Sequence, residues 1–134
     1  MKVTAAGPVA EQSACTCTRA FAGCPESVSA ARSWVAGFFP DPATAADAAL
    51  MTSELVTNAI KYTACCLPGG QVLVRVRTSE AGVRVHVIDQ GAVYPCFQVP
   101  GGLGLGLVIV RLLADACGCE GGNKWFALCT GGAR

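Results

Sequence analysis

The chain has 134 residues, of which 52% are hydrophobic, and its 10 basic and 9 acidic residues leave a formal charge of +1. This length and composition fit one domain with a sizeable core. The balanced charge argues against a nucleic-acid-binding surface, which ordinarily shows a basic patch or stripe. Because no apolar run approaches the ~20 residues that cross a bilayer and the first residues lack a signal-peptide core, we expect a cytoplasmic protein that does not bind membranes.

The hydrophobic pattern predicts one domain over residues 19–130, between a loose tail at 1–18 and a short tail at 131–134. Asp41 is placed to cap the second predicted helix. The expected elements, in chain order, are a strand at 19–22, helices at 25–38 and 42–62, strands at 71–78 and 83–89, a helix at 105–116 and a strand at 124–129. Together they predict an α/β (α+β) two-layer sandwich, with a mainly antiparallel sheet covered on one face by three helices.

The second predicted helix carries a polar stripe beside an apolar one. Glu54 and Asn58 are four residues apart, so they project from the same face of a helix, and Lys61 continues their stripe. An amide oxygen at Asn58 suits Mg²⁺, and Glu54 could orient or deprotonate an attacking hydroxyl or water. A solvated polar helix face explains the same pattern and stays open as the alternative.

A carboxylate and a glycine end the predicted strand at 83–89. Asp89 could accept a hydrogen bond from the exocyclic amine of a base, while Gly91 lets the backbone approach the ring closely. A plain strand-ending turn is the alternative.

Three glycines, at every second position, precede the third predicted helix. Gly102, Gly104 and Gly106 would expose backbone N–H groups at the positive end of that helix, where phosphate binds favourably. Their spacing fits neither the dinucleotide fingerprint nor a Walker A loop, and a flexible hinge is the alternative.

The order of these three segments resembles the N, G1 and G2 boxes of the Bergerat ATP-binding fold, the fold of the histidine-kinase-like ATPases. Within that superfamily the chain most resembles the anti-sigma factor serine/threonine kinases and their actinobacterial relatives. The segments that carry this closer resemblance are Ser53-Glu54-Leu55-Val56-Thr57-Asn58-Ala59, Gly104-Leu105-Gly106-Leu107 and Lys124-Trp125-Phe126-Ala127-Leu128.

The resemblance implies a role for each matching position. Asn58 would hold Mg²⁺ on the phosphates of ATP, and Glu54 would be the catalytic carboxylate that activates a serine hydroxyl. Asp89 with Gly91 would bind adenine, Lys61 would help to bind the phosphates, and the three glycines would form the end of the lid and the phosphate-binding turn. The implied function is phosphorylation of an anti-anti-sigma antagonist by a homodimer that also sequesters a sigma factor.

The expected lid departs from the family pattern. Residues 92–100 contain two prolines and no charged side chain, whereas lids that grip phosphates usually offer basic or hydroxyl groups. A catalytically weak or inactive, nucleotide-gated protein-binding module is therefore the alternative to a kinase.

Nine cysteines are unusual for a chain of this length. Their odd number argues against a disulfide framework, and the pairs Cys15/Cys17 and Cys117/Cys119 are C-x-C rather than the C-x-x-C of common zinc sites. Most of the cysteines are expected to be small core residues, with Cys15 and Cys17 exposed in the N-terminal tail. A metal- or redox-sensing protein is the third functional class.

Overall fold

The computed structural model of the chain describes residues 14–91 and 104–130. The strands are β1 (Cys15–Ala22), β2 (Gln71–Ser79), β3 (Gly82–Ile88), β4 (Ala116–Glu120) and β5 (Asn123–Leu128). The helices are α2 (Glu26–Ala36), α3 (Pro42–Tyr62), the 3-10 turn η1 (Ala64–Cys66) and α4 (Gly104–Leu113).

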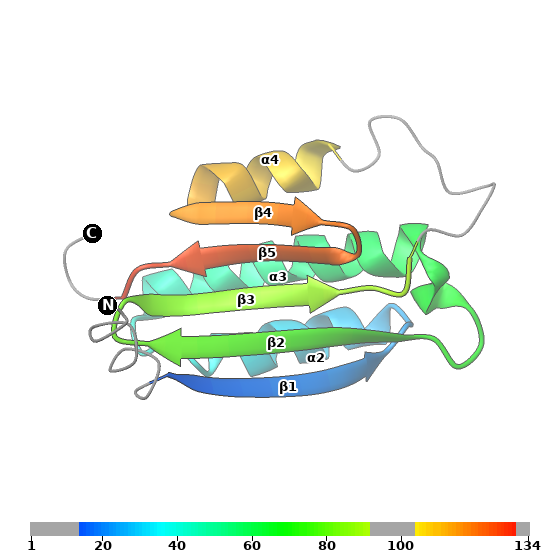
Figure 1. Ribbon diagram of the computed structural model, residues 1–134, viewed down its shortest axis with the longest axis horizontal. Helices are drawn as coiled ribbons and strands as arrows, with labels where there is room; N and C mark the ends of the chain where they lie inside the picture. Colours follow the sequence, from blue (N-terminus) through cyan, green and yellow to red (C-terminus); the bar gives the residue numbers. More distant parts are fainter. Residues whose placement is uncertain (1–13, 92–103, 131–134) are drawn as a thin grey trace, which may run out of the picture.

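The strands form one antiparallel sheet in the order β1-β2-β3-β5-β4. Helices α2 and α3 cover one face of this sheet, and α4 packs against α3 beside the edge strand β4 (Figure 1). This is the predicted two-layer α+β arrangement. Among the described residues, none of the helices is both long and apolar enough to span a membrane.

The alternation of valines decides which face of the sheet is covered. Every second residue from Val72 to Val76 in β2 and from Val83 to Val87 in β3 is a buried valine. The pairs Val74–Val87 and Val76–Val85 lie opposite one another. Period-two alternation places all of these side chains on the helix side. They pack there with buried residues of all three helices, among them Val35, Leu55 and Val110.

The start of α3 confirms a prediction about its cap. The Asp41 carboxylate accepts a hydrogen bond from the backbone N–H of Thr44 at 2.9 Å, and Pro42 occupies the first turn, where its missing N–H costs nothing. From there α3 continues to Tyr62, as predicted.

Two boundaries differ from the prediction by more than two residues. Strand β1 begins at Cys15 rather than Arg19, so Cys15 and Cys17 pair with β2 instead of lying in a tail. Helix α4 ends at Leu113, before the expected 116, and the chain then forms β4, a strand that the sequence analysis missed. Strand β4 contains no β-branched residue, so its extended conformation depends on pairing with β5 rather than on local propensity.

The ends of several helices and strands lie together at the end of the sheet shown at the right of Figure 1, which we call the site edge. The C-terminal ends of α3 and β3, the turn between β4 and β5, and the N-terminal end of α4 all lie there. The end of α3 after Asn58, the Asp89–Gly91 segment and the start of α4 at Gly104 therefore converge on this site edge, because the antiparallel topology returns the chain to it repeatedly.

Candidate functional site

Helix α3 brings the predicted polar stripe to this edge with unequal exposure. Asn58 is buried, at 7% relative exposure, whereas Glu54 is half-buried and Lys61 exposed. Because Asn58 is buried, this position is not part of a solvated polar helix face, which was the alternative interpretation of the stripe. Leu55 and Ala59 beside it are buried in the core, as expected.

The side-chain amide of Asn58 has an unused hydrogen-bonding group. Its Nδ2 atom is buried and has no hydrogen-bond partner among the described residues. Buried polar groups are ordinarily paired, and an orphaned one costs roughly 1–3 kcal/mol. Rotation of the amide by half a turn would put its oxygen in the same place, so the site can offer either a donor or an acceptor to a ligand.

The end of β3 is tied directly to the end of α3. The backbone N–H of Ala64, which follows α3, donates to the carbonyl oxygen of Gly91 at 2.7 Å. The backbone N–H of Gly91 donates in turn to Oδ1 of Asp89 at 2.7 Å. Gly91 has a φ of 92°, which L side chains rarely adopt, so glycine is needed at this turn.

Asp89 lies inside this edge rather than at the solvent surface. Its side chain is only 4% exposed, and its Oδ2 lies 3.4 Å from Nζ of Lys124. Its backbone N–H donates to the carbonyl oxygen of Gly122 at 2.8 Å, and a Cβ atom on Gly122 would lie only 2.7 Å from Oδ1. The turn between β4 and β5 therefore holds the carboxylate from one side.

Lys124 is a site residue that the sequence analysis missed. It pairs with Val87 in the β3–β5 register, so it projects from the core face of β5. The sequence did indicate this position, because alternate residues of a strand lie on the same face. Lys124 is therefore on the same face as the buried Phe126 and Leu128. A lysine on the apolar face of a strand indicates a buried acidic partner or an anionic ligand.

The glycine segment is only partly described. Gly104 opens α4 and Gly106 lies in its first turn, rather than in an extended loop before the helix. The expected site residue Gly102 and the expected lid, 92–100, lie outside the described residues. The described part of α4 packs against α3, which places the start of this helix near the other two segments.

A cavity of about 140 Å³ lies between α3, α4 and strands β4 and β5. Leu55, Leu107 and Val110 contribute apolar side chains to it, and Lys124 links it to Asp89. This volume is below the ~300–1,000 Å³ of ordinary ligand pockets, so it would receive only part of a ligand.

The described residues contain no cluster of three or more His, Cys, Asp or Glu side chains suited to a metal ion. The two C-x-C pairs lie on β1 and β4, the opposite edges of the sheet, so they cannot share one ion. Mg²⁺ needs fewer protein ligands, because it keeps several waters and binds substrate phosphates. The amide of Asn58 fits such a ligand when its oxygen takes the place of the unpartnered Nδ2.

A family model described as a histidine kinase-like ATPase domain matches residues 21–128. The match covers α3, the Asp89–Gly91 turn and α4, and therefore every predicted site residue. A comparison with curated proteins gives no match.

Proposed function

We propose, since the chain belongs to the histidine kinase-like ATPase domain family, that its ATP-binding site is the edge formed by α3, the Asp89–Gly91 turn and the start of α4. The observation that carries this proposal is the buried Nδ2 of Asn58, which has no hydrogen-bond partner in the described part of the chain, on the helix whose end is hydrogen-bonded to Gly91. A structural asparagine at this depth would have its polar atoms paired.

Each residue has a role in the proposed site. Asp89 would accept from the adenine amino group while it keeps Lys124 as its counter-ion, since a carboxylate offers about four acceptor positions. Asn58 would hold Mg²⁺, which would supply positive charge to neutralise the phosphates. Lys61 is exposed at the end of α3, where a flexible ammonium group can reach a phosphate. The backbone N–H groups at the start of α4, with Gly104 and Gly106, suit phosphate binding.

The proposed activity is transfer of the γ-phosphoryl group of ATP to a serine or threonine hydroxyl of a partner protein. Glu54 would accept the hydroxyl proton one helical turn from Asn58, and the site would otherwise act by positioning and charge neutralisation. The proposed partners are an anti-anti-sigma antagonist as substrate and a sigma factor that the chain, as a homodimer, sequesters. This part of the proposal is supported by the sequence resemblance.

One observation favours a second function, a nucleotide-gated binding module without phosphoryl transfer. The carboxylate of Glu54 makes no hydrogen bond or ion pair with any residue in the described part of the chain. A general base is usually oriented by a neighbouring group. In this second function ATP would set the affinity for a partner, and Glu54 would be dispensable.

Calorimetric titration of ATP, with and without Mg²⁺, tests the shared premise of both functions. We expect magnesium-dependent binding that is lost in Asn58→Ala and in Asp89→Asn. Asp47→Asn is the matched control, because it removes a half-buried carboxylate from the same helix at a distance from the proposed site. Absence of ATP binding by the folded wild-type chain would overturn the proposal.

A further inference from the structure

The face of the sheet opposite the helices carries two arginines in direct opposition. Arg77 of β2 and Arg84 of β3 are cross-strand partners, and both are exposed. Like charges placed directly opposite each other destabilise a sheet. Within residues 14–91 and 104–130, neither arginine forms an ion pair with a carboxylate. This arrangement suits an anionic group that is not among the described residues.

Arg84 is held in place by an aromatic ring. Its guanidinium carbon lies 4.0 Å from the centroid of the Trp125 ring, over the face of that ring. Such a cation–π contact uses the flat side of the guanidinium and leaves its N–H groups free at the edges. The side chain is therefore oriented before any ligand binds, which lowers the entropic cost of binding a carboxylate.

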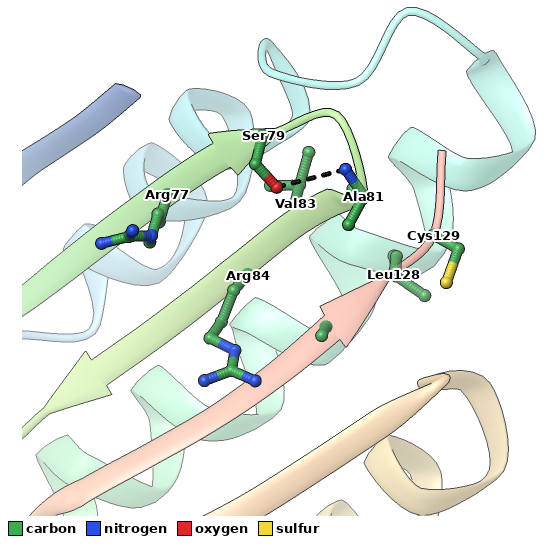
Figure 2. A pocket seen from close by; sticks show the side chains of 9 residues that line it. Arg77, Ser79, Ala81, Val83, Arg84, Leu128 and Cys129 are labelled. Atoms are coloured by element: carbon green, nitrogen blue, oxygen red, sulfur yellow. Dashed lines mark hydrogen bonds between the residues drawn. The ribbon is translucent and has the colours of Figure 1, made fainter. Parts of the chain in front are cut away.

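A hollow of about 300 Å³ adjoins the two arginines. It is formed by the β2–β3 hairpin and the end of β5, and its lining includes Ser79, Gly82 and Ala127 (Figure 2). Most of its lining side chains are small, so the main chain of the hairpin is accessible beside the guanidinium groups.

The basic surface continues along β2 beyond this hollow. Arg75 lies two residues before Arg77, on the same face, and its Nε donates to the hydroxyl of Thr18 at 3.2 Å. Three arginines along two strands extend over more surface than a single small anion would cover. The shape and charge fit an extended, acidic stretch of polypeptide, in which every second side chain points to the same side.

We propose that Arg77 and Arg84 form a docking site for an acidic segment of a partner protein, bound in extended conformation with carboxylates on the two guanidinium groups. Planar guanidinium groups match carboxylates with paired, charge-assisted hydrogen bonds. The site goes beyond the proposed ATP site, because Asp89 and Lys124 lie on the helix side of the sheet and Arg77 and Arg84 on the other.

Fluorescence anisotropy with a labelled peptide of alternating glutamate and serine tests this docking site. We expect saturable binding that weakens about tenfold in Arg77→Gln or Arg84→Gln, as loss of a charge-assisted hydrogen bond implies. A peptide with glutamine in place of glutamate should not bind. Arg32→Gln is the matched control, since Arg32 is an exposed arginine on α2, on the helix side.

Several results would overturn the docking site. They are equal binding of the glutamine peptide, equal weakening in Arg32→Gln, or unchanged binding in the double variant Arg77→Gln/Arg84→Gln. Displacement of the peptide by an equal concentration of inorganic phosphate would also contradict it, in favour of a small-anion site. Self-association that is lost in the arginine variants, measured by sedimentation, would instead identify a second copy of the chain as the occupant.

Control measurements distinguish loss of peptide binding from loss of the fold and from loss of the ATP site. The arginine variants should retain the wild-type circular dichroism spectrum and the wild-type affinity for ATP. Arg84→Lys, which keeps the charge but loses the planar fork, should bind the peptide more weakly than wild type and more tightly than Arg84→Gln. Equal affinities of the lysine and glutamine variants would contradict the proposed paired hydrogen bonds.

Discussion

The carboxylate of Asp89 lies 3.4 Å from the ammonium group of Lys124, and this contact joins the end of β3 to the start of β5. Both side chains project to the helix side of the sheet, where the carboxylate is almost fully buried. The pair therefore has two consequences, one for the stability of this edge and one for the group that is proposed to bind adenine.

Replacing Lys124 by methionine should destabilise the chain by about 2 kcal/mol, because it leaves the buried carboxylate of Asp89 without its counter-ion. Urea denaturation measures this loss. In the double variant Asp89→Asn/Lys124→Met the total loss should be smaller than the sum of the single losses. Lys61→Met, at an exposed position, should change the free energy of unfolding by less than about 0.5 kcal/mol. Additive single effects would show that the two residues are not coupled.

Two buried threonines should respond in opposite directions to replacement by valine. The hydroxyl of Thr52 is buried and has no partner in the described part of the chain, so Thr52→Val should stabilise by about 1 kcal/mol. The hydroxyl of Thr63 donates to the carbonyl of Ala59 at 2.6 Å and accepts from the N–H of Cys65 at 3.2 Å. Thr63→Val should therefore destabilise by about 1–3 kcal/mol. Thermal denaturation of both variants gives the comparison, and destabilisation by both would contradict the unsatisfied state of Thr52.

Gly91 and Gly69 form a matched pair for separating strain from function. Both have positive φ, 92° and 79°, and an added Cβ at either position would meet no atom of the described residues within 4 Å. Alanine at either site should cost about 1–2 kcal/mol from backbone strain alone. Only Gly91→Ala should also weaken ATP binding, since Gly91 belongs to the turn that holds Asp89. Calorimetric titration of both variants tests this, and equal ATP affinities would separate Gly91 from the nucleotide site.

Glu54→Gln distinguishes the two proposed functions. A kinase should keep its affinity for ATP and lose about 10²–10⁴-fold in the rate of phosphoryl transfer, because a glutamine cannot accept the hydroxyl proton. The measurement is transfer of radiolabel from ATP to serine in candidate partner proteins, with Asp47→Asn as the control. Partner binding that needs ATP but yields no label, even with the wild-type chain, would favour the nucleotide-gated module.

Much of the fold was predictable because its signals are local. Alternating valines defined β2 and β3, and Asp41 marked the start of α3. Strand β4 was missed because its residues have low strand propensity and are held extended by their pairing with β5. The start of β1 was missed for a similar reason, since Cys15 and Cys17 become part of a strand through their pairing with Thr78 and Val76.

The candidate site was predictable in part. The spacing of Glu54, Asn58 and Asp89 indicated a nucleotide site, and the family match covers these positions. The partnership of Asp89 with Lys124 was not predicted, because the residues are 35 positions apart and meet only through the β3–β5 register. The stripe on α3 gave no indication that Asn58 would be buried while Lys61 stays exposed.

The sequence by itself determined every α-helix and every strand except β4, the faces of β2 and β3, and the three segments that identify the family, because periodicity, capping and motif spacing are local properties of the chain. Only the tertiary structure decided which of those residues meet. The hydrogen bond from Ala64 to Gly91, the ion pair at Asp89, and the opposition of Arg77 and Arg84 all depend on strand register and helix packing. The first two relations join segments distant in the chain, which meet because the common core is buried between them. The third is set by the register of the β2–β3 hairpin.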